Sequence, residues 1–154
     1  MVASVLSGGC AGTYQAELLS ARKHGKPIFI RRLQPHHPAR SGEIGVSVQF
    51  FNTSGKTYKY VDISVEAYNR VGDAIRHHDP RYSTIAKLRF TGPLLPRRTP
   101  GTTLWPQVWY SGTVSCVAIR RIDITHMDLT KHTIEAPALA GILASAVPQN
   151  CPTA

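Results

Sequence analysis

The chain has 154 residues, of which 42% are hydrophobic and 18% are charged, a balance that excludes an intrinsically disordered chain and favours one globular domain. Its 18 Lys and Arg residues outnumber its 9 Asp and Glu residues, so the net charge of +9 favours anionic partners: nucleic acid, anionic lipid or an acidic protein. Eleven prolines and 12 glycines divide the sequence into short segments, which favours many short strands over a few long helices.

The N-terminal stretch, MVASVLSGGCAG, has features of the end of a secretion signal. A short apolar run and small residues precede Cys10, which makes Cys10 a candidate for lipidation. The stretch lacks a positively charged start, and Ser7 stands where a lipobox has a large apolar residue. Two interpretations stay open: the remnant of a signal that starts further upstream, or a stretch without a targeting role. No apolar run reaches the roughly 18 residues that a transmembrane helix needs.

Residues 1–25 are expected to form an N-terminal extension. Within it, TYQAELLSARKH (13–24) predicts a short amphipathic helix with Thr13 as its N-cap and Gly25 as its stop. KPIFIRRL (26–33) predicts the first strand. QPHHPARSG (34–42) predicts a loop, because two prolines and a glycine disfavour regular structure.

The strongest pattern is a pair of alternating segments, 45–51 and 57–68, on either side of the turn NTSGK (52–56). Alternation with a period of two is typical of strands that are buried on one face. Asn and Gly in a short connection favour a tight reversal, so we expect a β-hairpin. The residues expected to face the core are Val46, Val48, Phe50, Val61, Ile63, Val65 and Ala67, with Asp62, Ser64 and Glu66 facing outward.

The second half of the chain predicts three further strands. NRVGD (69–73) is a turn, and the next ten residues form an irregular edge, because Pro80 cannot donate to a sheet. A strand follows at 84–92, with Ala86, Leu88 and Phe90 on its inner face, and then a proline-rich loop at 93–103. Residues 113–127 form one long strand, or two that join at Arg120-Arg121, with Val114, Cys116 and Ala118 inward before the junction and Ile122 and Ile124 after it. A last short strand covers HTIE (132–135).

Together these elements predict an all-β fold, an antiparallel β-sandwich of about seven short strands that spans residues 26–135. The C-terminal tail, 136–154, is expected to contain a short helix over APALAGILASA (136–146), with Pro137 near its first turn. The remaining VPQNCPTA is expected to be a loose end.

Three segments in order resemble a family of small bacterial immunoglobulin-like domains. They are VSVQFFNTSGKTYKYVDISVEAYNRVGD, AKLRFTGPLLP and VWYSGTVSCVAIRRIDITHMD, and the resemblance covers roughly residues 45–135. It implies an immunoglobulin-like sandwich in a secreted or envelope-anchored bacterial protein, but no specific activity, because sandwiches have many functions. The chain departs from the pattern in two places: it has no cysteine after the turn at 69–73, and MDLTK replaces an MDG turn, which implies a longer reversal.

The aromatic residues Trp105, Trp109 and Tyr110 are expected to form a cluster that covers one end of the sandwich, because large rings bury much apolar area in small β cores. Three cysteines leave an odd count. Cys116 is then either a small buried residue of the core or the partner of Cys151 in a disulfide, which requires that the tail folds back and that the compartment is oxidising.

The expected surface for an anionic partner consists of basic residues from several segments. They are Lys56, Lys59, Arg70, Lys87, Arg89, Arg97, Arg98, Arg120 and Arg121. The loops at 34–42 and 93–103 are further candidates for contact surfaces. Anionic lipid is one expected partner, and outward tyrosines beside Lys56 and Lys59 also leave nucleic acid open as a less favoured one.

No catalytic or metal-binding motif is recognisable. The sequence has no GxSxG, P-loop or HExxH, and its paired histidines, His36-His37 and His77-His78, lack the spacing of a zinc site. We therefore expect no catalytic residue, no metal and no cofactor. The predicted function is a non-enzymatic binding or structural module of the bacterial envelope, with a protein partner there, as a lipoprotein subunit of a larger assembly or as a secreted protein. The alternative is a basic nucleic-acid-binding β domain of the cytoplasm.

Overall fold

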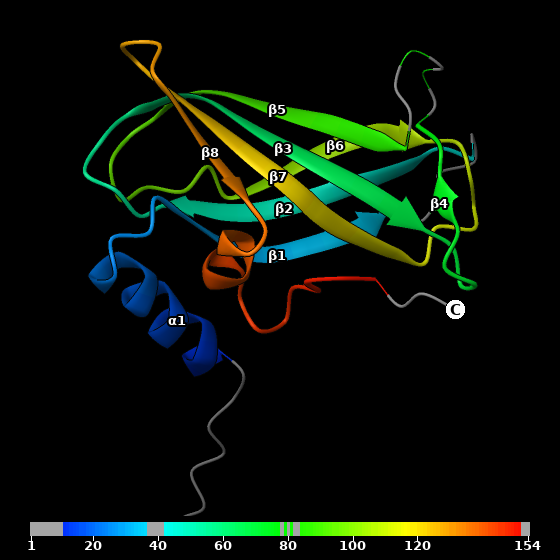
Figure 1. Ribbon diagram of the computed structural model, residues 1–154, viewed down its shortest axis with the longest axis horizontal. Coiled ribbons are helices and arrows are strands. Elements are labelled where there is room, and N and C mark those ends of the chain that lie inside the picture. Colours follow the sequence, from blue (N-terminus) through cyan, green and yellow to red (C-terminus); the bar gives the residue numbers. More distant parts are fainter. Residues whose placement is uncertain (1–10, 37–41, 78, 80, 82–83, 152–154) are drawn as a thin grey trace, which may run out of the picture.

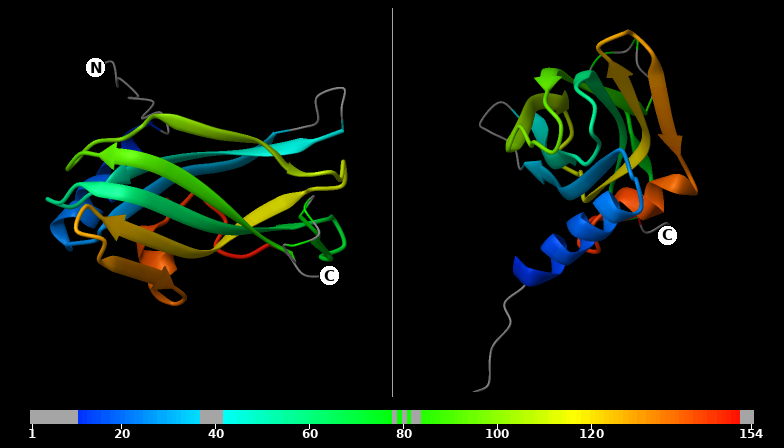
Figure 2. Two further views of the ribbon diagram at one scale, coloured as in Figure 1. Left: turned by 90° about the horizontal axis from the view of Figure 1, so that it is seen from above. Right: turned by 90° about the vertical axis from the view of Figure 1, so that its left-hand side faces the viewer.

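Two antiparallel sheets pack face to face across the hydrophobic core of the protein (Figures 1 and 2). This computed structural model describes residues 11–36, 42–77, 79, 81 and 84–151. The elements are α1 (Ala11–Lys23), β1 (Ile28–His36), β2 (Ile44–Asn52), β3 (Tyr58–Tyr68), β4 (Ala74–Ile75), β5 (Ile85–Leu94), β6 (Thr102–Trp109), β7 (Cys116–His126), β8 (Lys131–Glu135) and the 3-10 helix η1 (Ala138–Ile142).

The strand order confirms the predicted immunoglobulin-like β-sandwich. One sheet has the order β1-β2-β6, and the other has the order β4-β3-β7-β8 with β5 also paired to β3. The chain therefore crosses between the sheets after β2, after β5 and after β6. Immunoglobulin-like sandwiches share the first of these crossings, because their second strand lies in one sheet and their third strand lies in the other.

The hairpin predicted at residues 45–68 is wrong, although both of its strands exist. β2 pairs with β1 and β6, whereas β3 pairs with β5 and β7 in the opposite sheet. The turn at 52–56 instead carries the chain across the sandwich. Asn52 fixes it, because its Nδ2 donates to the carbonyl oxygens of Lys56 (2.7 Å), Leu95 (3.1 Å) and Leu94 (3.2 Å). The predicted inward faces are confirmed: all seven apolar residues named above are fully buried.

The predicted helix exists and begins at Ala11, so Thr13 lies inside the helix rather than at its N-cap. Its end is fixed by a Schellman motif, in which the backbone N–H of Lys26 donates to Ala21 O (2.9 Å) and that of Gly25 donates to Arg22 O (3.1 Å). Gly25 has a φ of +67°, a conformation that a glycine adopts without strain. Leu18 and Ala21 attach the helix to the core.

Two of the predicted loops are shorter than expected, because strands extend into them. β1 continues to His36 and includes Pro35, which a strand at the edge of a sheet tolerates. Residues 37–41 lie outside the described residues. The proline-rich segment 93–103 contains the end of β5 and the start of β6. The sequence prediction missed β6 as a strand, and this second edge strand includes Pro106 for the same reason.

A β-bulge in β7 reverses the predicted orientation of Cys116. Ser64 pairs with Arg121 but its neighbour Val65 pairs with Ile119, so Arg120 is the extra residue. Within the strand before the bulge, the core face consists of Val117 and Ile119 instead of Cys116 and Ala118, whereas Val114, which precedes the strand, is buried in the core as predicted. Cys116 and Ala118 therefore lie on the outer face of the sheet.

The tail covers this outer face, so the prediction of a loose end is wrong for residues 147–151. The predicted short helix is present as η1, and Val147 and Cys151 beyond it are buried. A disulfide joins Cys116 to Cys151, with 5.7 Å between their Cα atoms. The tail also contacts the edge of β1, where Ala144 N donates to Ile30 O (2.8 Å). The C-terminal segment is therefore part of the folded domain.

The connection between β7 and β8 is a tight turn rather than the longer reversal expected from its missing glycine. His126 N donates to Thr130 O (2.9 Å), and Leu129 N donates to His126 O (3.0 Å). Leu129 adopts a φ of +70°, in the left-handed region that disfavours residues with a Cβ atom. Because glycine avoids this strain, we expect Leu129→Gly to raise the free energy of unfolding by about 1 kcal/mol. Chemical unfolding of the two proteins measures this difference, and an equal or lower stability of the variant would contradict it.

Candidate functional site

Three loops leave the sandwich at the same end. Tyr58, the first residue of β3, pairs with Leu94 at the end of β5 and with His126 at the end of β7. The loops at 52–57, 95–101 and 127–130 are therefore neighbours, at the left-hand end of the molecule in Figure 1 and in the left panel of Figure 2. The link between α1 and β1 joins them, because the Tyr58 hydroxyl donates to Pro27 O (2.6 Å).

Backbone hydrogen bonds hold these loops in one arrangement. Asn52 N donates to Arg98 O (2.9 Å), and Thr53 N donates to Pro27 O (3.2 Å). The Thr53 hydroxyl also donates to Lys26 O. The Tyr58 and His126 rings are in edge contact, with 5.3 Å between their centroids. Side chains that project from these loops are thus positioned by a connected network rather than by separate mobile turns.

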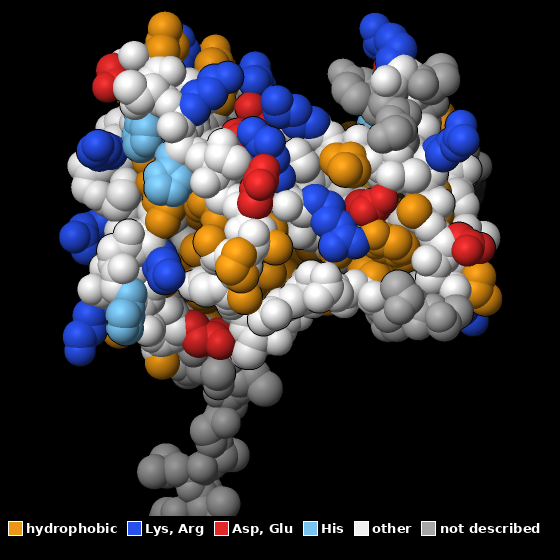
Figure 3. Space-filling view, in the orientation of Figure 1, with side chains coloured by type: hydrophobic (Ala, Val, Ile, Leu, Met, Phe, Trp, Pro, Cys, Tyr) orange, Lys and Arg blue, Asp and Glu red, His pale blue; other side chains and the backbone are white. Residues whose placement is uncertain are grey.

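Cations concentrate at this end of the sandwich. We define the basic end as Lys26, Lys56, Lys59, Arg97, Arg98 and Lys131. Within the part of the chain that the structure describes, none of these six residues is in an ion pair. Figure 3 shows Lys, Arg and His side chains along this left-hand edge of the molecule. The basic end therefore has positive charge that is available to a partner.

Asp128 is an acidic residue at the same end. Hydrogen bonds from the Thr130 side chain and backbone lower the pKa of its carboxyl, and the nearby charges of His126 and Lys56 lower it further. This carboxylate is held by its own turn, where Thr130 donates to it through both N (3.0 Å) and Oγ1 (2.6 Å).

The outer face of the five-stranded sheet, in contrast, has balanced charges. Arg89 donates to both carboxylate oxygens of Asp62 (2.7 and 2.9 Å), and Lys87 lies 3.7 Å from the same group. The Asp62 side chain is only 4% exposed, so these cations compensate a carboxylate that is nearly buried. Three more ion pairs follow along β7: Arg120 with Glu66 (3.1 Å), Arg121 with Asp123 (2.9 Å) and Arg121 with Glu135 (3.0 Å).

The nine basic residues predicted to form one anionic-partner surface are therefore divided among three places. Lys56, Lys59, Arg97 and Arg98 belong to the basic end. Lys87, Arg89, Arg120 and Arg121 are paired on the outer face of the sheet, and Arg70 lies at the opposite end, in the turn after β3. Sequence inspection missed Lys26 and Lys131, because only the fold brings them next to the other loops.

Two carboxylates on the outer face of the five-stranded sheet, those of Glu66 and Asp123, predict how the free energy of unfolding depends on pH. Burial alone would raise the pKa of Glu66 and of Asp123, but hydrogen bonds from neighbours lower both. The donors are Thr84, Tyr68 and Arg120 for Glu66, and Arg121 and Thr133 for Asp123.

Because these folded-state pKa values are below the unfolded ones, the stabilisation is complete above about pH 4.5 and is lost as pH falls through the folded values. We expect the free energy of unfolding to decrease between about pH 5 and pH 2, and to decrease less in Asp123→Asn. Urea unfolding across this range measures both slopes. Equal slopes for the two proteins would contradict the role of Asp123.

Trp105, Trp109 and Tyr110 do not form the single aromatic cluster that was predicted for one end of the sandwich. Trp109 is fully buried in the core, whereas Trp105 is half-buried and its Nε1 donates to Arg89 O (3.3 Å) across the gap between the sheets. Tyr110 is 61% exposed, and its hydroxyl donates to Glu43 (2.8 Å), which raises the pKa of Tyr110. The two tryptophans belong to the sandwich and the tyrosine belongs to its surface.

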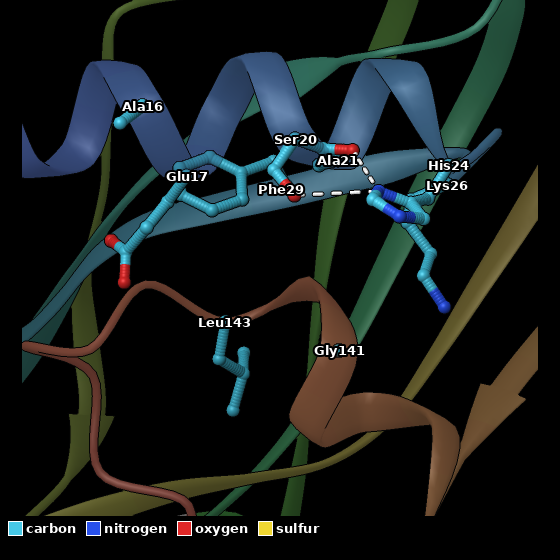
Figure 4. Close-up of a pocket in the computed structure, with 9 residues that line it drawn as sticks. All are labelled: Ala16, Glu17, Ser20, Ala21, His24, Lys26, Phe29, Gly141 and Leu143. Atoms are coloured by element: carbon cyan, nitrogen blue, oxygen red, sulfur yellow. Dashed lines mark hydrogen bonds between the residues drawn. The ribbon is translucent and has the colours of Figure 1, made fainter.

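A cleft of about 390 Å³ lies between α1 and η1, beside the basic end (Figure 4). Ser20 and His24 line it, but His24 Nδ1 is 2.8 Å from Ser20 O, so this nitrogen is the donor of that bond. Glu17 accepts from Ser145 N (3.1 and 3.3 Å) rather than from His24. A Ser-His-acid triad needs His to accept the serine proton and the acid to orient His. His24 Nδ1 also lies 3.3 Å from Ser20 Oγ, but a nitrogen that donates to Ser20 O cannot accept the proton of this hydroxyl, and the hydrogen bonds of Glu17 go to Ser145 N.

Within the described ranges, no group of three or more His, Cys, Asp or Glu side chains could hold a metal ion. The described helices include none that is long and apolar enough to cross a membrane. Cys10, the candidate for lipidation, lies outside the described residues.

Comparison with known proteins adds little to this description. No family model matches the chain, and no curated protein matches it. A crystal structure of a hypothetical protein from Peptoclostridium difficile 630 is similar, with 9% sequence identity and a TM-score of 0.48, over 74% of this chain and 88% of that one. Membership of the bacterial immunoglobulin-like family stays a prediction from the sequence.

Proposed function

We propose that this protein is a non-enzymatic binding module of the bacterial cell envelope, and that its basic end holds an anionic partner. The observation that carries the proposal is the contrast between the two charged regions. On the outer sheet face every cation named above forms an ion pair with a carboxylate, whereas none of the six cations of the basic end forms one among the described residues. Lys56 acts on the carboxylate of Asp128 only at longer range. Cations without internal partners raise the local concentration of anionic ligands and are free to contact them.

The disulfide supports the envelope location. Disulfides form and persist in oxidising compartments such as the periplasm and the cell exterior, and they are rare in the cytosol. The bridge between Cys116 and Cys151 uses two of the three cysteines and leaves Cys10 for lipid attachment. Attachment at Cys10 and membership of a larger envelope assembly, with a protein partner, are parts of the proposal. The arrangement of Ser20, His24 and Glu17 supports a non-enzymatic role for the cleft.

Retention on a heparin column tests the basic end, because heparin is an immobilised polyanion. We expect Arg97→Gln/Arg98→Gln to elute at clearly lower salt than the unchanged protein. The matched control is Arg70→Gln/Arg76→Gln, which removes the same charge from exposed residues near the opposite end of β3. If the elution salt concentration falls equally in both variants, net charge alone governs retention and the proposed site is wrong.

A cytoplasmic nucleic-acid-binding role is the second candidate, because unpaired cations on neighbouring loops also suit a phosphate backbone. Mixed-sequence DNA separates the two roles. Tight binding that weakens steeply with salt, through Arg97 and Arg98, would favour this alternative, whereas absence of binding at low salt would eliminate it.

A further inference from the structure

The basic end also carries exposed hydrophobic side chains at the tips of its loops. Leu95 is 54% exposed in the loop after β5, and Met127 and Leu129 are 55% and 62% exposed in the β7–β8 turn. Figure 3 shows hydrophobic atoms that protrude over this turn at the upper left, next to basic side chains. Folding removes little of the surface of these side chains from water, so they contribute little to the stability of the protein.

Backbone strain occurs at the same two loops. Among the described residues, the non-glycine positions with positive φ are Arg97 (58°) and Leu129 (70°). Arg97 lies in a turn that Arg98 N closes on Leu95 O (3.3 Å), where glycine would be less strained. Each position thus holds a large side chain at a conformational cost. One side chain is a cation and the other is an exposed hydrophobic group, and strain of this kind tends to occur at binding sites.

We propose that the basic end docks on the surface of an anionic lipid bilayer. In this arrangement Lys56, Arg97 and Arg98 contact the negatively charged headgroups, and Leu95, Met127 and Leu129 insert at the boundary between headgroups and acyl chains. The inference rests on the proposed anion-binding function and names its partner.

The combination of side chains favours a bilayer over a nucleic acid. A phosphate backbone offers contacts to cations but nothing that removes exposed leucine or methionine from water. A bilayer offers both, because its surface potential attracts cations and its interfacial region accepts apolar side chains. Hydrogen bonds join the loops at 52–57 and 95–101, and the pairing of β7 with β3 places the β7–β8 turn beside them. The two kinds of side chain are therefore held in fixed relation, which reduces the entropy lost on docking.

Co-sedimentation with vesicles tests the proposal. One set contains phosphatidylglycerol mixed with phosphatidylcholine, and the other contains phosphatidylcholine alone. We expect binding to the first set only. Arg97→Gln/Arg98→Gln should weaken it roughly 25-fold, at about fivefold for each cation. Met127→Gln/Leu129→Gln should weaken it about tenfold or more, because two apolar groups are lost from the interface.

Val71→Gln is the matched control, because Val71 is 59% exposed in the turn after β3, far from the basic end. Its binding should stay within about twofold of the unchanged protein, since it touches no lipid in this arrangement. Leu129→Gly should also bind more weakly although it removes backbone strain, which separates lost binding from lost folding. Thermal unfolding of each variant verifies that it is folded.

Four other results would each overturn a different part of the proposal. If the unchanged protein is retained on heparin but does not bind anionic vesicles, the lipid proposal is overturned and the anion-binding function stands. If Met127→Gln/Leu129→Gln and Val71→Gln both bind anionic vesicles like the unchanged protein, insertion is overturned. Equal binding to both vesicle sets would overturn the role of the cations. Failure on heparin and vesicles alike would remove the proposed function itself.

Discussion

Loss of the bridge between Cys116 and Cys151 should lower the free energy of unfolding by about 3–4 kcal/mol. The two residues are 35 positions apart in sequence, and a covalent link over this length restricts the unfolded chain substantially. Typical domains have a free energy of unfolding of about 5–15 kcal/mol, so the loss of the bridge removes a large part of the stability of the protein. We expect the tail beyond Val147 to detach first, because the bridge attaches it to β7.

Guanidinium unfolding of Cys116→Ala/Cys151→Ala measures this effect, with Cys10→Ala present in all proteins to prevent exchange of thiols. The double variant avoids a lone buried thiol that single substitutions would leave. Limited proteolysis provides a second readout, since cleavage in the tail beyond Val147 should appear in the variant before the sandwich is cut. A variant as stable as the bridged protein would show that the disulfide has no structural role.

Trp109→Ala should lower the free energy of unfolding by about 3–5 kcal/mol. The Trp109 side chain is fully buried at the end of β6, where the residue pairs with Ile44 of β2. Its removal leaves a large cavity between the sheets that neighbouring strands can fill only in part. Trp105→Ala should have a smaller effect, because Trp105 is half-buried and contacts solvent.

The indole N–H of Trp109 provides a sharper test of this account. This buried nitrogen has no hydrogen-bond partner among the described residues, so the folded protein carries its desolvation penalty. Trp109→Phe removes the penalty and keeps most of the apolar volume, and we expect it to lose less than half of the stability that Trp109→Ala loses. Urea unfolding compares the three proteins. Similar losses for Phe and Ala would mean that the indole nitrogen has a partner.

The sequence predicted the strands of the sandwich well, because alternation is a local property. Residues such as Val61 and Ile63 face the core as expected, and the short strand at 132–135 is present. The pairing of β2 was not predictable from its turn. Asn and Gly favour a reversal, but Asn52 is used to bind the loop at 94–95, so the chain crosses to the other sheet.

A single extra residue explains the wrong orientation of Cys116. The bulge at Arg120 shifts the alternation of β7 by one position, and no local pattern in the sequence marks it. The last eight residues of the tail, VPQNCPTA, were predicted to be a loose end. The tail is held instead by the disulfide and by Ala144, which are contacts with residues far away in sequence.

The basic end was predictable only in part. Its cations appear in the sequence, but so do cations that pair with Asp62 or Asp123, and only the fold separates the two groups. The one local signal was the missing glycine in MDLTK, which sequence inspection interpreted as a longer turn. In the structure this departure places an exposed leucine at a strained position.

The most direct test of the central claim, an exported and disulfide-bonded binding module, is an intact-mass measurement without reductant. The protein is isolated from the envelope and cytosolic fractions of cells that make it naturally. The account predicts an envelope protein whose mass is lower by two hydrogen atoms than after reduction, with the Cys116–Cys151 peptide pair in its digest, and a species that begins at Cys10 with added acyl mass would establish the lipoprotein. A cytosolic protein with free thiols at both Cys116 and Cys151 would contradict it.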